Sequence, residues 1–172
     1  DDVTRVGPAL LGLIAALAVF LGLRSGSRGG PLALEQPDVR HVLLAPVDRG
    51  VALRGPAWRQ LRFLAFAGAG VGAAAGQLAL RRLPGNGALW IVCGAAFAVV
   101  VAGLGFGCAL VASGAKLPRW AATLIGLVLV AWSVAEVAGK VSFAPATVIG
   151  HLGTYPLDHD LLSLVGIPLA IG

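Results

Sequence analysis

Residues 24–62 read RSGSRGGPLALEQPDVRHVLLAPVDRGVALRGPAWRQLR, and the rest of the fold can be worked out from them. This is the one long polar segment in an otherwise apolar sequence, and it carries seven of the thirteen Lys and Arg residues. An isolated Arg at the centre of a bilayer costs about 2.5–3.5 kcal/mol. The segment is therefore expected outside the membrane, and the apolar runs on either side of it are predicted to be lipid-embedded helices.

The composition is typical of a polytopic membrane protein. Hydrophobic residues make up 58% of the chain and charged residues only 12%, whereas a soluble domain carries roughly 25% charged residues. The formal net charge of +5 does not indicate nucleic-acid binding, because the Arg residues flank apolar runs, where basic residues set topology and touch anionic headgroups. We therefore expect membrane lipid, and no nucleic acid, among the partners.

Four apolar runs are long enough to cross a hydrocarbon core about 30 Å thick, and a fifth begins near the end of the sequence. The runs cover about residues 7–23, 63–80, 88–113, 120–139 and 161–172. The last run is cut short, and the chain begins Asp-Asp and contains no Met. We therefore expect residues 1–172 to be a single transmembrane domain from a longer protein, folded as an all-α polytopic helical bundle.

Regularly spaced glycines indicate faces on which helices pack closely. Gly68, Gly72 and Gly76 recur every four residues, and Gly103 and Gly107 repeat the step in the next run. This spacing leaves a stripe without side chains that another helix backbone can approach. A general richness in Gly and Ala would produce the same pattern, so both interpretations stay open.

The distribution of basic residues predicts the topology. Placing residues 24–62 and 116–119 on one side of the membrane puts nine Lys and Arg residues there. The other side then holds four, which are Arg5, Arg81, Arg82 and Lys140. The positive-inside rule therefore predicts that residues 24–62 form a cytoplasmic loop.

Residues 141–160 do not fit a straight spanning helix. They are less apolar than the runs before them and are interrupted by Pro145, Gly150, Gly153 and Pro156. Irregular backbone at membrane depth is tolerated where it is buried in protein or lines a wet cavity. The segment is predicted to form broken helices, or a re-entrant segment, on the outer side.

The sequence gives little support for catalysis. It contains no HExxH, CxxC or GxSxG motif and no Gly-rich phosphate loop. Gly70, Gly72 and Gly76 imitate part of a dinucleotide fingerprint, but they lie in an apolar run and follow no strand. Cys93 and Cys108 are about 22 Å apart along a continuous helix, too far to pair. We expect neither an enzyme nor a cofactor or metal site in this chain.

Several ionisable groups leave alternatives open. Glu136, near the end of an apolar run, could be a proton or cation site, or it could form an ion pair with Lys140 at i+4. The outer segment also contains metal-ligand residue types without a recognised spacing, namely His151, Asp158, His159 and Asp160. An intramembrane enzyme that uses these groups is a weaker hypothesis.

The polar loop contains a short amphipathic helix. Pro37 and Asp38 are typical of a helix start, and Pro46 ends the pattern. The apolar residues between them fall at i, i+3 and i+4, and they are Val39, Val42 and Leu43. This face could enter a groove of a soluble partner, with register fixed by the rim charges Arg40, Asp48 and Arg49. Alternatively, the helix rests on the headgroups.

The run from Gly29 to Arg49, above all DVRHVLLAPVDR at residues 38–49, resembles the cytoplasmic loop of bacterial ABC exporter permeases. The resemblance implies a type-2 export fold, in which six helices per permease half form a dimeric path and short coupling helices rest on the ATPase subunits. It identifies the coupling residues as Asp38, Val39, Arg40, Val42, Leu43, Leu44, Pro46 and Arg49. Residues 143–158, FAPATVIGHLGTYPLD, resemble the outer re-entrant helices of that fold.

The resemblance also implies a function. The chain would be a membrane permease subunit of an ATP-driven exporter in the bacterial inner membrane, coupling a separate cytoplasmic ATPase to outward movement of a substrate. ATP and Mg would be held by that partner, and a second permease subunit would complete a homo- or heterodimer. The alternative is a non-transporting scaffold subunit of a bacterial membrane complex, whose loop binds a partner without cycling.

Overall fold

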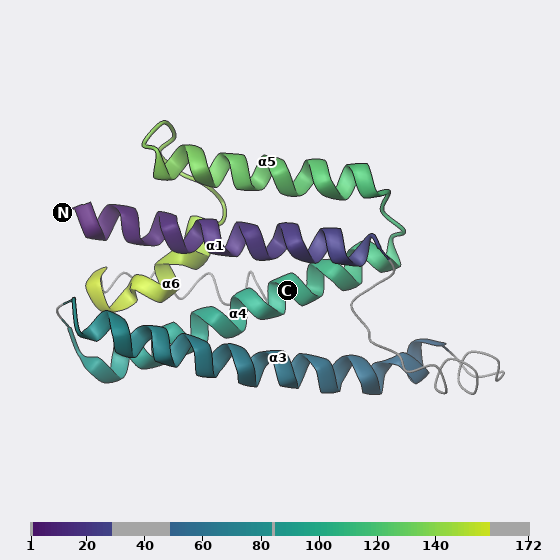
Figure 1. The fold of residues 1–172 in the computed structure, drawn as a ribbon, viewed down its shortest axis with the longest axis horizontal. Coiled ribbons are helices and arrows are strands. Elements are labelled where there is room, and N and C mark those ends of the chain that lie inside the picture. The colour runs from purple at the N-terminus through teal and green to yellow at the C-terminus, as the bar shows by residue number, and fades with distance from the viewer. Residues whose placement is uncertain (1, 29–48, 84, 159–172) are drawn as a thin grey trace.

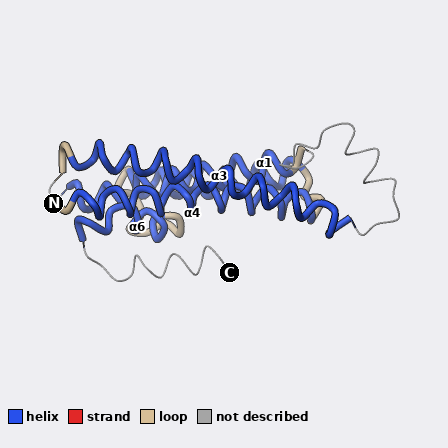
Figure 2. Tube along the Cα trace, turned by 90° about the horizontal axis from the view of Figure 1, so that it is seen from below, coloured by secondary structure: helices blue, strands red, loops and turns tan. Residues whose placement is uncertain are grey.

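The structure, a computed structural model, describes residues 2–28, 49–83 and 85–158. Within these ranges the chain is helical and contains no strand (Figure 2). The helices are α1 (Asp2–Gly26), α3 (Arg49–Leu80), α4 (Gly87–Gly114), α5 (Arg119–Val137) and α6 (Thr147–Asp158). The prediction of an all-α fold is confirmed for the described residues.

Four of these helices are long and apolar enough to cross a membrane. The apolar segments are Val6–Gly26, Arg54–Leu80, Gly87–Gly114 and Arg119–Val137. They contain 19 to 28 residues, whereas a 30 Å hydrocarbon core requires roughly 20. Their length and composition are those of a multi-pass membrane protein.

The long helices lie side by side, with α1 in the middle (Figure 1). α1 packs against α4 on one side and α5 on the other, and α3 packs on α4. The chain reverses direction between successive long helices. The start of α1, the turn at residues 81–87 and α6 therefore share one end of the bundle, here called the α6 end. The opposite end, reached by the starts of α3 and α5, is called the Arg-rich end.

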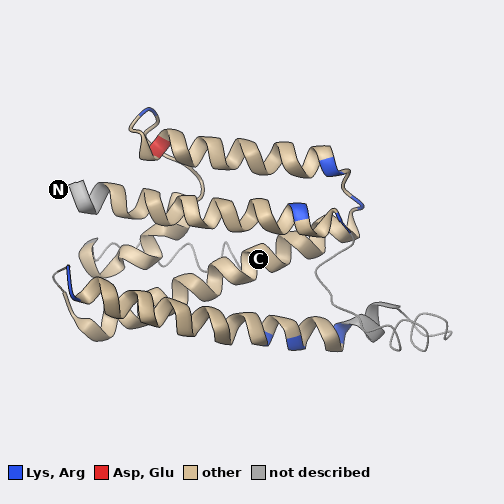
Figure 3. Ribbon diagram, in the orientation of Figure 1, with Lys and Arg blue, Asp and Glu red and all other residues tan. Residues whose placement is uncertain are grey.

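Basic side chains gather at the Arg-rich end (Figure 3). Those described there are Arg24, Arg28, Arg54, Arg59, Arg62, Lys116 and Arg119. Those described at the α6 end are Arg81, Arg82 and Lys140. The Arg62 guanidinium carbon lies 5.2 Å from the centroid of the Trp58 ring, a cation–π contact. The positive-inside rule predicts that this end faces the cytoplasm.

α3 begins earlier than the apolar run predicts. The sequence assigned residues 24–62 to the loop, but the helix already starts at Arg49 and continues through Pro56. The physical reason is that charged side chains end an apolar run without ending a helix, because outside the bilayer a helix tolerates them freely. The part of the polar segment that precedes α3 is correspondingly shorter.

Candidate functional site

The predicted coupling residues fall largely outside the described ranges. Asp38, Val39, Arg40, Val42, Leu43, Leu44 and Pro46 lie outside them, and Arg49 is the first residue of α3. The described parts do fix the attachment points of the loop. α1 ends at Gly26 and α3 begins at Arg49, and both points lie at the Arg-rich end (Figure 1).

Two glycines of α3 bring its backbone against that of α4. A Cβ atom placed on Gly72 would lie 2.1 Å from the carbonyl oxygen of Gly94. One placed on Gly76 would lie 2.1 Å from the carbonyl oxygen of Trp90. No side chain fits at either position, so the close approach of the two helices depends on glycine. We call this contact the α3–α4 seam.

The other predicted packing glycines have looser surroundings. A Cβ on Gly68 would lie 3.1 Å from the carbonyl oxygen of Ala98, so it too faces α4, at a wider separation. Gly103 and Gly107 have nothing within 4 Å of a Cβ among the residues that the structure describes. The α3 glycines therefore meet a neighbouring backbone, and the two α4 glycines face open space in the described chain.

A second glycine contact, which the sequence did not indicate, joins α1 to α6. A Cβ on Gly150 of α6 would lie 2.0 Å from the carbonyl oxygen of Pro8, and one on Gly12 of α1 would lie 2.8 Å from the Cα of Thr147. We call this the α1–α6 seam. The glycine content of both segments was the available signal, but more than 130 residues separate the partners, so spacing along the chain could not pair them.

This seam places the start of α6 against the middle of α1 and its end beside the turn between α3 and α4. Thr147 lies against Gly12, about 9 Å along α1 from Val6, where the apolar segment begins. The carbonyl oxygen of Pro156 lies 3.6 Å from a Cβ placed on Gly85, in the turn between α3 and α4. The chain thus enters the bundle after α5, and α6 leads it back to the α6 end.

A pocket of about 450 Å³ at the α6 end is lined by several polar side chains. Glu136 in the last turn of α5 lines it, together with Thr147 and His151, which are one turn apart on α6. The Thr147 hydroxyl donates a hydrogen bond to the Glu136 carboxylate. A carboxylate has about four acceptor positions, so this one could accept further hydrogen bonds from a ligand that carries N–H donors, such as an amine.

The partner of Glu136 differs from the Lys140 side chain that the i+4 spacing suggested. α5 ends at Val137, and Gly139 has a φ of 70°. The backbone N–H of Gly139 donates to the carbonyl oxygen of Glu136 over 2.8 Å, which turns the chain away from the helix axis. Lys140 consequently leaves the helix face, and the carboxylate is bound by Thr147 instead.

The described side chains offer no metal site. Among them, no group of three or more His, Cys, Asp or Glu residues lies close enough to hold a metal ion. Of the suggested outer cluster, only the side chain of His151 is described, and it lines the polar pocket. Asp158 ends α6, and its side chain is not described; His159 and Asp160 lie outside the described residues.

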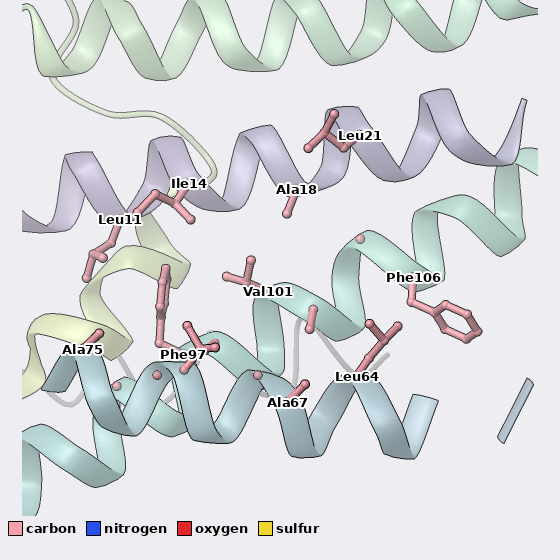
Figure 4. Close-up of a pocket in the computed structure, with 18 of the residues that line it drawn as sticks. Leu11, Ile14, Ala18, Leu21, Leu64, Ala67, Ala75, Phe97, Val101 and Phe106 are labelled. Carbon is pink, nitrogen blue, oxygen red and sulfur yellow. The ribbon is translucent and has the colours of Figure 1, made fainter. Parts of the chain in front are cut away.

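An apolar groove of about 800 Å³ lies between α1 and α3, with α4 as its floor (Figure 4). Side chains of both walls and the floor point into it, among them Leu11, Ile14, Ala18, Leu64, Ala67 and Val101. None of the residues that line the groove is charged. Such a surface can receive an acyl chain or an apolar helix, but not a charged ligand.

Comparisons with protein families, with curated proteins and with solved structures found no match to this chain.

Proposed function

We propose that the chain is the membrane permease subunit of an ATP-driven ABC exporter in the bacterial inner membrane. The observation that carries the proposal is the sequence DVRHVLLAPVDR at residues 38–49, which leads directly into α3 at Arg49. Four candidate spans and the position of α6 at the end opposite the loop are compatible with it.

In this proposal residues 38–44 form a coupling helix that docks on a separate cytoplasmic ATPase. Its apolar face, Val39, Val42 and Leu43, enters a groove of that subunit, and Arg40 and Arg49 set the register at the rim. The partner holds ATP and Mg. A second permease subunit completes the path, and the glycine seams allow helices to shift against each other with little steric resistance.

The decisive variants are Val42→Asp and Leu43→Asp, expressed in native membranes. An unpaired charge in an apolar contact is desolvated at a cost of several kcal/mol, so we expect the copurifying ATPase to be lost. Membrane insertion should remain normal. Leu34→Asp, the same change in the same loop but outside the motif, is the matched control. A normal yield of ATPase with Val42→Asp would show that residues 38–44 are not a coupling helix.

The class of the complex is tested by purifying the native assembly and identifying its members by mass spectrometry. We expect a soluble protein with ATPase activity in stoichiometric amount. If other membrane subunits are recovered without an ATPase, the exporter assignment is wrong and the scaffold alternative is favoured. Arg49→Ala should weaken the association less than Val42→Asp, because a charge at the rim remains hydrated.

A further inference from the structure

The polar pocket at the α6 end combines one carboxylate with apolar surface. It lies where the start of α1, the last turn of α5 and the start of α6 meet. Among the side chains that the structure describes, Glu136 is the only Asp, Glu, Lys or Arg that lines it. Val6, Pro8 and Val141 supply apolar surface. The volume of about 450 Å³ is typical of a site for a small molecule.

The carboxylate of Glu136 has one oxygen to spare. Thr147, which is 5% exposed, donates its hydroxyl hydrogen to Oε2. In the described part of the chain no second hydrogen bond or ion pair reaches this carboxylate, so Oε1 can accept a further donor. The imidazole of His151 lines the same pocket, and in its neutral form it accepts one more N–H. These acceptors favour a positively charged ligand that donates hydrogen bonds.

The end of α5 adds two more acceptors to the pocket. Val137 is the last residue of α5, and both it and Ala138 line the pocket. Within the described ranges no backbone N–H donates to the carbonyl oxygen of either residue. The C-terminal end of a helix also carries a partial negative charge, which favours a cation nearby. The N-terminal end of α6 has the opposite polarity, and it begins at Thr147, beside the carboxylate, where a negative charge is favoured.

This set of acceptors suits an ammonium group better than a metal ion. A divalent ion such as Ca²⁺ takes about six or more oxygen ligands and is usually held by several carboxylates. The described lining of the pocket supplies a single carboxylate. A primary ammonium group has three N–H donors, and Oε1 of Glu136 with the two carbonyl oxygens of α5 can accept that number.

We propose that this pocket binds a primary ammonium group, with Glu136 as the counter-ion and the apolar body of the ligand against Val6 and Pro8. Two sources carry such a group, namely a soluble amine and the ethanolamine headgroup of a phospholipid. The inference is independent of the proposed transport function, and its test measures binding alone.

Fluorine NMR of a small amine tests the proposal. The full chain is placed in nanodiscs of phosphatidylcholine, whose headgroup has no N–H donor, and titrated with 4-fluorobenzylamine. Empty nanodiscs measure partition into lipid. Two analogues separate charge from hydrogen bonding: 4-fluorobenzyl alcohol has no charge, and 4-fluorobenzyltrimethylammonium has the charge but no N–H. We expect the amine to bind about tenfold more tightly than either analogue, because hydrogen bonds to charged groups are the stronger ones.

A pair of variants assigns the binding to Glu136. Glu136→Gln keeps an oxygen that can accept the Thr147 hydroxyl but removes the charge, so we expect binding of the amine to weaken about tenfold. Lys140→Gln is the matched control, because it changes a neighbouring charge that does not line the pocket. This control should bind the amine at least as tightly as the unmodified chain. Thermal midpoints of both variants show whether the fold is kept.

Nanodiscs that contain phosphatidylethanolamine distinguish the two sources. If this lipid weakens binding of 4-fluorobenzylamine to the unmodified chain, the lipid headgroup occupies the pocket. If binding is unchanged, the ligand is a soluble amine. Either result supports an ammonium site.

Three results would overturn the proposal. The first is equal binding of the amine and its two analogues, and the second is equal binding of the amine to Glu136→Gln and the unmodified chain. The third concerns Arg5, which precedes Val6 in α1 and whose side chain is not among those described. Binding that appears only in Arg5→Gln would show that this guanidinium, and no ligand, is the counter-ion of Glu136.

Discussion

Two sets of glycines with the same spacing have different surroundings in this molecule. Gly72 and Gly76 of α3 lie so close to α4 that no Cβ would fit. Gly103 and Gly107 of α4 repeat the four-residue step but have no atom within 4 Å of a Cβ in the described chain. The comparison teaches that spacing creates a face without side chains, whereas only a neighbouring backbone makes that face a contact.

The two sets also differ in how glycine affects the free energy of folding. A glycine inside a helix costs about 1 kcal/mol relative to alanine. At Gly72 that cost is offset by the close approach of two backbones and the dispersion contacts that follow from it. At Gly103 the described residues provide no such gain, so alanine should be at least as favourable there.

The largest effect is expected for Gly72→Ala. Its Cβ would lie 2.1 Å from the carbonyl oxygen of Gly94, so the helices must separate, and overpacking of this kind costs about 1–3 kcal/mol. Thermal unfolding in detergent can be followed with a thiol-reactive dye in a Cys108→Ala background, because Cys93 on α4 is buried in the folded chain, whereas Cys108 is only partly buried. We expect a clearly lower midpoint than for Gly103→Ala. Equal midpoints for the two variants would refute the comparison.

A smaller effect is expected where α6 is held by a polar contact as well as by glycine. Thr147→Val removes the hydroxyl that donates to the Glu136 carboxylate. Because Glu136 is partly exposed, water replaces part of the lost bond and the cost should be about 1 kcal/mol. Hydrogen exchange should become faster in residues 147–158 and remain unchanged in α3. Thr123→Val, on the exposed side of α5, is the control.

The smallest effect, and of opposite sign, is expected for Gly103→Ala and Gly107→Ala. Each should leave the unfolding midpoint unchanged or raise the stability by up to about 1 kcal/mol, because alanine favours the helix. The same dye assay measures it. A loss of stability in the isolated chain would mean that these glycines contact an atom outside the described residues.

Four of the apolar runs predicted where the long apolar helices lie, because the cost of charge in lipid acts on the sequence directly. The start of α3 was missed for the complementary reason: outside lipid, Arg54, Arg59 and Arg62 are ordinary helix residues. Similarly, the i+4 rule for Glu136 and Lys140 holds only while the helix continues, and α5 ends at Val137. Local rules failed where a helix boundary decided the geometry.

The α1–α6 seam could not be predicted from spacing at all. Gly150 and Gly153 were interpreted as breaks in residues 141–160, but α6 is a continuous helix through both. In a membrane protein a glycine either interrupts a helix or provides a surface on which another helix packs. Which of the two occurs depends on whether another helix lies beside it. Here that neighbour is the first helix of the chain, at Pro8 and Gly12.

α3 is one unbroken rod of 32 residues, about 48 Å long, although the bilayer core is only about 30 Å thick. In the proposed exporter, α3 would tilt about its contact with α4 at Gly72. A tilt of about 5° there would sweep the Arg49 end sideways by about 3 Å, since some 34 Å of helix lies between them. Pro56 cannot donate a backbone hydrogen bond, so any bending of α3 would concentrate at that residue.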